Sequence, residues 1–249
     1  MTGENIQAIP TVSELVRRNY RAADVLRKWG INYCCSGNVS LAEACALKGI
    51  DEAAVQQDLN AAGRQICLPA GLQYQDWPVE FLIDYIVHVH HAYLKQVLPA
   101  LHQQLNGFVK GHTKKYPYLQ EVGDVFNDLK TELEEHNAKE EERIFPYLRQ
   151  IASTYKRRET YGSLFVRTLG KPLDKMVAID HNRIAALLDQ LRSVTNQYHF
   201  AEGACTNHQV LYHKLKELDN DLVQHKHLEN NILYPRVLQM EQELLQPVS

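Results

Sequence analysis

Two segments of the sequence share a pattern of residue types that bind metal ions. They are "HNAKEEERIFP" at residues 136–146 and "HKHLENNILYP" at residues 225–235. Each begins with a histidine and carries a glutamate four residues later, an aromatic residue nine later and a proline ten later. A spacing of four residues places the imidazole and the carboxylate on one face of a helix.

A lone histidine precedes each motif: His91 lies 45 residues before the first, and His181 lies 44 residues before the second. All of these polar residues continue apolar stripes at helical spacing, so we expect them to face a helical core. A single core histidine is usually explained by a hydrogen bond, and a buried carboxylate without a partner costs several kcal/mol. The duplicated spacing instead favours a pair of metal ions. The predicted ligands are His91, His136, Glu140, His181, His225 and Glu229.

The number and type of these ligands indicate which metal they bind. Four imidazoles and two carboxylates exceed what a tetrahedral zinc site uses. Imidazole combined with carboxylate suits iron, and carboxylate-bridged iron or manganese pairs are held in the cores of helix bundles. Iron is therefore the favoured ion.

The elements that must position these ligands are four long helices. Apolar periodicity predicts them near residues 78–106, 120–152, 172–198 and 206–242, joined by short or moderate loops. Such an order is typical of an up-down four-helix bundle, and the expected fold class is all-α. Three prolines fall inside these patterns, where each is expected to kink or end its helix: Pro99, Pro146 and Pro235.

The region before the bundle predicts short helices. "SELVRRNYRAADVLRKWG" has a helical rhythm that ends at Gly30, and Ser40 with Glu43 forms a capping box for the next helix. Asp51 is placed to cap a third helix, and residues 67–78 have the proline and glycine content of a linker. We therefore predict a small helical domain at residues 1–70 and the bundle at residues 71–249.

Composition excludes several classes of protein. The formal net charge is -3, with 27 basic and 30 acidic residues, which argues against a nucleic-acid partner. No apolar run approaches the roughly 18 residues of a membrane span, and the first ten residues do not read as a secretory signal. Five cysteines, two of them adjacent, fit a disulfide framework poorly and favour a reducing cytoplasm.

The histidine–glutamate motifs, each closed by a proline, resemble the hemerythrin-like bundle. Some hemerythrins carry a second histidine four residues after the third-helix ligand, where this chain has Ala185. The N-terminal stretch "VLRKWGINYCCSGNVSLAEACALKGID" is similar to the cysteine-containing domain that precedes such a bundle in the repair-of-iron-centres family. That family commonly has two glycines after the cysteine pair, and Ser36 replaces the first of them.

This resemblance implies roles for the predicted ligands. The four histidines would be terminal ligands, while Glu140 and Glu229 would bridge two iron ions that also share an oxo or hydroxo bridge. One position on each iron would stay open for water, oxygen or nitric oxide. Cys34 and Cys35 could pass iron as thiolates or act in redox chemistry, or they could be ordinary cysteines. The remaining cysteines are expected to be structural: Cys45, Cys67 and Cys205.

The resemblance also implies a function, the repair of iron–sulfur clusters damaged by oxidative or nitrosative stress, with damaged iron–sulfur proteins as partners. Iron donation is favoured over a turnover enzyme. One alternative is a protein that binds or reduces nitric oxide, and another is a gas sensor whose N-terminal domain docks a partner. A homodimer is one expected assembly.

Other histidines receive structural interpretations. His88 and His90 flank a predicted ligand without sharing its stripe, and His227 points away from the ligand face. His112 is expected in a loop, where it could line an entrance to the site.

Overall fold

The computed structural model describes residues 9–34, 37–63, 72–158, 162–169 and 173–246, without the side chains of residues 163, 165, 168, 169 and 173–181. Throughout these ranges the secondary structure is helical, apart from one isolated antiparallel bridge between Thr11 and Ser40. The predicted all-α class is therefore confirmed. Two compact units are present: residues 1–69 with 198–215, and residues 70–197 with 216–249. The domain boundary near residue 70 stays a prediction.

The first unit contains four short helices: α1 (Val12–Arg18), α2 (Ala22–Lys28), α3 (Leu41–Ala46) and α4 (Glu52–Gly63). The prediction of one helix from residue 13 to Gly30 was wrong. Asn19 has extended backbone, and its side-chain oxygen accepts the N–H of Arg21, a local turn that competes with helix. Gly30 takes the left-handed conformation with φ +67°, as expected after a helix.

Helix capping in this unit follows the expected chemistry. Ser40 and Glu43 form a complete capping box at the start of α3, and Thr11 with Glu14 forms a second one at α1. The Asp51 side chain accepts the N–H of Ala53 at 3.0 Å, at the start of α4.

The first part of α11 (Thr206–Leu228) belongs to the same unit. Val210 lies in the apolar core with residues of α1 to α4. The hydroxyls of Ser13 and Thr206 are hydrogen-bonded at 2.9 Å, and the Lys214 ammonium pairs with Asp24. Residues almost 200 positions apart in sequence therefore hold this unit together.

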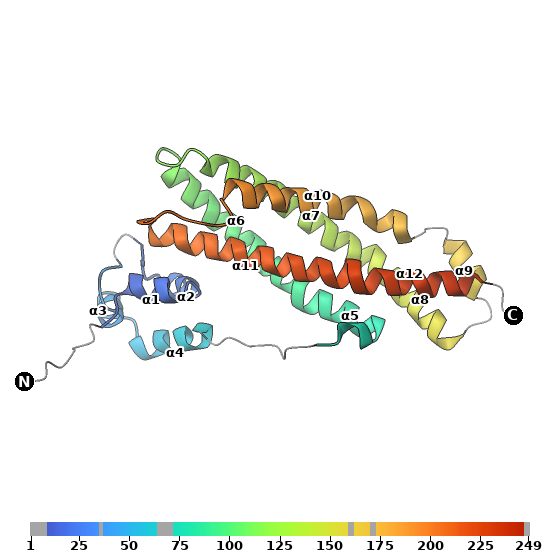
Figure 1. Ribbon diagram of the computed structural model, residues 1–249. Coiled ribbons are helices and arrows are strands. Elements are labelled where there is room, and N and C mark those ends of the chain that lie inside the picture. The colour runs from blue at the N-terminus through green and yellow to red at the C-terminus, as the bar shows by residue number, and fades with distance from the viewer. Residues whose placement is uncertain (1–8, 35–36, 64–71, 159–161, 170–172, 247–249) are drawn as a thin grey trace, which may run out of the picture. The chain divides into compact units, whose positions relative to one another are not determined.

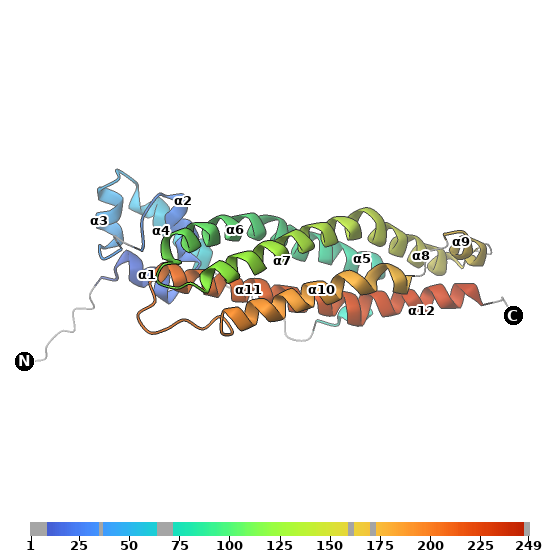
Figure 2. The ribbon, with the colours of Figure 1, turned by 90° about the horizontal axis from the view of Figure 1, so that it is seen from above.

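The second unit is the four-helix bundle (Figures 1 and 2), in which successive long helices run in alternating directions. Three of the four contain a π-helical segment. The first comprises α5 (Val79–Tyr85), η2 (Ile86–His91) and α6 (Ala92–His112). The second comprises α7 (Leu119–Lys139), η3 (Glu140–Ile144) and α8 (Phe145–Arg157). The third is α10 (Leu173–Val194), and the fourth comprises the rest of α11, η4 (Glu229–Leu233) and α12 (Tyr234–Leu245).

Two short elements complete the bundle unit, the 3₁₀ turn η1 (Tyr74–Asp76) and α9 (Gly162–Leu169). Helix α7 packs against α6 and α10, and α8 packs against α5 and α12. The apolar core at the α5, α8 and α12 end consists of aliphatic and aromatic side chains, among them Leu82, Ile151, Leu233 and Val237. No helix among the described residues is long and apolar enough to cross a membrane.

The prolines do not end the helices. Pro146 and Pro235 lie in the first turn of α8 and α12, immediately after the π segments η3 and η4. Proline lacks an N–H, so the helix loses a hydrogen bond there, and the wider π turn accommodates the change of register. Pro99 lies inside α6, which stays helical on both sides of it. Of the two expected effects, termination of the helix does not occur, and a kink at each proline stays a prediction.

Candidate metal centre

The π segments carry the predicted ligands. His91 is the last residue of η2, and Glu140 and Glu229 are the first residues of η3 and η4. His136 and His225 lie in the last turns of α7 and α11, four residues before their glutamates. Single-turn π segments occur frequently at functional sites because they redirect side chains that a regular helix would space evenly.

Four of the predicted ligands form a compact buried group: His91, Glu140, His225 and Glu229. One ligand atom from each lies within 4.8 Å of all the others. Their exposed fractions are 0%, 0%, 3% and 1%, so water does not stabilise these polar groups. The Nε2 atoms of His91 and His225 are 3.2 Å apart, and Nε2 of His225 lies 2.8 Å from Oε1 of Glu229.

His136 joins this group through a carboxylate. Its Nε2 lies 3.3 Å from Oε2 of Glu140, and Nε2 of His91 lies at the same distance from the same oxygen. We call His91, His136, Glu140, His225 and Glu229 the central cluster. The sixth predicted ligand, His181, belongs to α10, but its side chain lies outside the described residues.

The electrostatics of the central cluster are those of a cation site. Burial is the largest cause that lowers the pKa of His225 to about 3; the charge of Glu140 opposes this shift, and the nearby His91 and His90 add to it. Burial also acts to lower the pKa of His91, but hydrogen bonds and charge from Glu140 and Glu141 outweigh it and raise that pKa. The two buried carboxylates repel one another. The imidazole nitrogens that face one another have too few protons to hydrogen-bond to all of their neighbours. A bound cation removes both problems, so the donor set fits a metal ion.

A second layer of side chains orients the central cluster. Nδ1 of His91 lies 2.8 Å from Oε1 of Glu141, which also accepts from the Lys95 ammonium at 2.9 Å. The hydroxyl of Tyr234 donates to Oε1 of Glu140. Partners of this kind fix the orientation and basicity of metal ligands.

His90 and Asp221 also adjoin the cluster, and the prediction that His90 lies off the ligand face was wrong. The His90 ring is buried, stacks on His225 with centroids 5.3 Å apart, and places Nδ1 2.9 Å from Oδ1 of Asp221. The π segment η2 is the cause, because it turns two successive histidines inward. In the sequence, only the adjacency of His90 and His91 indicated that His90 lies near the site.

The other histidines lie elsewhere. His88 and His227 are exposed, and His227 pairs with the amide of Asn231 at 2.8 Å. His112 is the last residue of α6 instead of a loop residue, and its Nδ1 donates to the carbonyl of Phe108 at 3.0 Å. It lines neither of the hollows described next.

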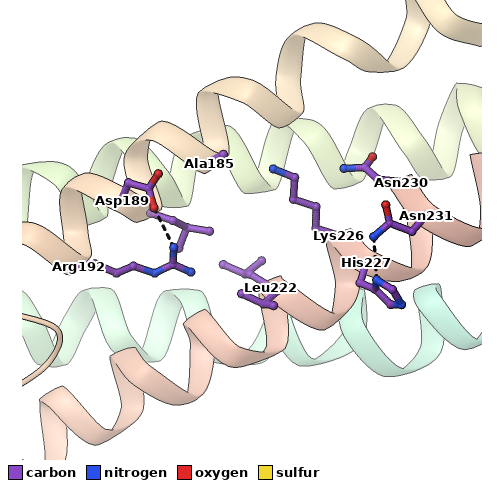
Figure 3. Close-up of a pocket in the computed structure, with 10 residues that line it drawn as sticks. Ala185, Asp189, Arg192, Leu222, Lys226, His227, Asn230 and Asn231 are labelled. Atoms are coloured by element: carbon purple, nitrogen blue, oxygen red, sulfur yellow. Dashed lines mark hydrogen bonds and ion pairs between the residues drawn. The ribbon is translucent and has the colours of Figure 1, made fainter.

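A groove lies between α10 and the α11–η4 segment, and Figure 3 shows residues that line it. This outer groove has a volume of about 500 Å³ and is lined by residues that include Ala185, Asp189, Arg192, Lys226 and Asn230. An inner cavity of about 20 Å³ is lined by His136, His225 and Glu229, together with apolar residues. The two hollows share three lining residues, Leu188, Leu222 and Lys226. The Lys226 side chain extends toward α10 at this junction.

The predicted thiol pair lies in the first unit. Cys34 is partly exposed, and Cys35 lies outside the described residues, as does Cys67. Cys45 is buried in the core of the first unit, which raises the pKa of its thiol, and Cys205 is partly exposed. Burial of Cys45 is consistent with its expected structural role.

Comparison with known proteins places both parts of the chain. Residues 9–63 match the ScdA_N model, described as a domain of unknown function (DUF542), and residues 82–164 match the hemerythrin HHE cation binding domain. The iron-sulfur cluster repair protein ScdA of Staphylococcus haemolyticus is 28% identical over 223 residues, which cover 90% of this chain and 95% of that protein.

Two further relatives are similar along almost their whole length. The iron-sulfur cluster repair proteins YtfE of Escherichia coli O157:H7 and of Citrobacter koseri are each 30% identical over 227 residues, covering 91% of this chain and 96% of each relative. The predicted hemerythrin-like bundle is thereby confirmed. The chain belongs to the family of iron–sulfur cluster repair proteins.

Proposed function

We propose that this protein holds a pair of iron ions in the bundle and donates iron to iron–sulfur clusters damaged by oxidative or nitrosative stress. The observation that carries this proposal is the buried central cluster, in a chain whose relatives are named as cluster repair proteins. The partners are damaged iron–sulfur proteins, and the expected compartment is the cytoplasm.

The proposed ligands are the four histidines His91, His136, His181 and His225, with Glu140 and Glu229 as bridging carboxylates. Support comes from Glu140, whose Oε2 lies 3.3 Å from the Nε2 atoms of both His91 and His136. Glu229 stands in the same sequence relation to His225 in the second motif. Iron held by this set of nitrogen and oxygen donors would supply redox chemistry and a divalent ion that can leave the site.

The surrounding residues determine how firmly the ligands are held. Glu141 accepts from His91, which fixes the ring so that Nε2 faces the cluster. The Lys95 and His91 hydrogen bonds outweigh the effect of burial and lower the pKa of Glu141, keeping it ionised. We include Cys34 and Cys35 in the proposal as thiols that could receive iron on its way to a client protein.

Transfer of iron to a client tests this function. The protein would be loaded with ⁵⁷Fe(II) without oxygen and mixed with an aconitase-type protein whose [4Fe–4S] cluster has lost one iron to peroxide, with the same thiol reductant in every mixture to supply the electron that rebuilding the cluster requires. We expect the label to enter the client's cluster in the presence of a chelator that captures free Fe(II), whereas the same amount of free Fe(II) restores nothing. Equal restoration by the metal-free protein, or complete capture by the chelator, would contradict iron donation.

Binding of nitric oxide is a second candidate function, favoured by the outer groove and inner cavity that reach His136, His225 and Glu229. Ala185, where some hemerythrins have a histidine, lines the groove, and its small side chain leaves this approach open. Ala185→Phe would obstruct this approach with a larger side chain. Catalytic loss of nitric oxide with an added electron donor would indicate an enzyme, and stoichiometric binding would indicate a receptor.

For this substitution we expect the association rate of nitric oxide with the iron-loaded, reduced protein to fall at least ~tenfold, which corresponds to about 1.4 kcal/mol in the barrier. Stopped-flow absorbance would measure the rate. Ala186→Phe is the matched control, because Ala186 is exposed and does not line either hollow. Equal rates in the two variants would show that small ligands reach the site by another route.

A further inference from the structure

The two duplicated motifs differ at their aromatic position, which touches the central cluster in both. The aromatic residue nine positions after the histidine is Phe145 in the first motif and Tyr234 in the second. Both begin the helix that follows a π segment, α8 and α12 respectively, and both are buried. At this position the two motifs therefore differ by one hydroxyl group.

That hydroxyl has a defined acceptor in the other motif. Tyr234 donates to Oε1 of Glu140, while Oε2 of the same carboxylate faces the Nε2 atoms of His91 and His136. Phe145 has no group to donate, and its ring stacks on His91 with centroids 5.6 Å apart. One motif thus supplies a proton donor to a carboxylate, and the other supplies only an apolar face.

A hydrogen bond to a carboxylate oxygen stabilises the free anion, which lowers the basicity of the carboxylate and weakens it as a ligand for a cation. Within the proposed iron site, Glu140 receives this hydrogen bond from the phenol of Tyr234. Phe145, at the equivalent position of the other motif, has no hydroxyl to donate to Glu229. The two carboxylates are then unequal ligands, although their sequence motifs are equivalent.

We propose that Tyr234 is a positioning residue that would make the two iron positions unequal, so that one iron would be held more weakly through Glu140 and would leave first. This inference rests on the proposed function and adds an order of release to it. One ion would be available for donation while the other keeps the ligands organised.

Equilibrium titration with Fe(II) alone, without oxygen and against a competing chelator, tests the inference. We expect two separate binding steps in the original protein. In Tyr234→Phe the weaker step should tighten, so that the two steps lie closer together. Mössbauer spectra should change from two distinct iron environments toward one.

If Tyr234→Phe folds poorly, two further variants of the protein test the same inference. Replacing Tyr234 with a difluorotyrosine retains its shape and makes the phenol a stronger donor, so the two steps should separate further. The double variant Tyr234→Phe with Phe145→Tyr should restore unequal steps by moving the donor to the other motif. Circular dichroism of each metal-free protein would verify folding.

The outcomes distinguish the inference from the function on which it rests. Two bound irons with binding steps that none of these changes alters would overturn the role of Tyr234 and leave iron donation intact. A folded original protein that binds no Fe(II) would overturn both.

Discussion

Replacing Glu140 or Glu229 with glutamine is expected to lower the bound metal from about two ions per chain to one or none, and the double replacement should abolish binding. Glutamine keeps the shape and one acceptor oxygen, so Tyr234 can still donate to residue 140. It removes the negative charge that makes a carboxylate a ligand for a hard cation. Loss of an outer partner that orients a histidine ligand, as Glu141 orients His91, costs roughly 10–100-fold in metal affinity, so loss of a bridging carboxylate should exceed that.

Metal analysis and the absorption spectrum of the purified variants would measure this effect. Glu142→Gln is the matched control, since Glu142 is exposed and lies only two residues after Glu140. It should bind metal like the original protein. If metal content and spectrum survive both ligand replacements, neither glutamate belongs to the site.

The same variants predict an effect on stability that depends on metal. A ligand that binds only the folded state stabilises it by mass action, so the original protein should melt at a higher temperature with iron than without. The double variant should lose this difference.

Much of the bundle was predictable from sequence because amphipathic helices carry apolar residues at a regular spacing. The stripe through Leu218 and Leu222 continues into His225, which identified both the helix and its inward face. The helix boundaries near residues 78, 120, 172 and 206 agree with the structure to within a few residues. The duplicated motif located the site, because polar residues on an apolar stripe need a physical explanation.

The structural features that the sequence did not predict depend on local departures from regular helix. The π segment η2 brings His90 inward beside His91, and a wheel with 3.6 residues per turn cannot reproduce that. The break at Asn19 arises from its side-chain oxygen, which accepts the backbone N–H of Arg21. Neither feature changes the hydrophobic pattern on which the helix prediction relied.

The side chains that orient the ligands could not be predicted from the sequence, for a different reason. Glu141 and Tyr234 act on ligands from other helices, His91 and Glu140, and such pairings depend on how the helices pack. Glu141 follows the proposed bridging glutamate directly, and no spacing rule separated it from the other acidic residues around it. Tertiary structure was needed to assign these partners.

In the metal-free protein, stability is expected to fall as the pH decreases from about 6.5 toward 3, because of His225. Burial, aided by the neighbouring His91 and His90, lowers its pKa to about 3 in the folded state, whereas an unfolded histidine titrates near 6.5. Between these values the unfolded chain binds more protons, so acid favours unfolding, by up to several kcal/mol. The raised pKa of His91 acts in the opposite direction, since its contribution is full below about pH 6.5 and is lost as the pH rises.

Denaturant unfolding of the metal-free protein between pH 4 and pH 7 isolates the His225 contribution when the original is compared with His225→Gln, which has no titrating group there. The variant should show a shallower loss of stability in acid, with the remaining slope due to other groups. His227→Gln is the control, because His227 is exposed two residues away and its replacement should leave the original slope. Parallel curves for the original and His225→Gln would mean that His225 accepts a proton in the folded protein. The buried site would then contain a charged imidazole, and its neutral donor character would depend on the metal itself.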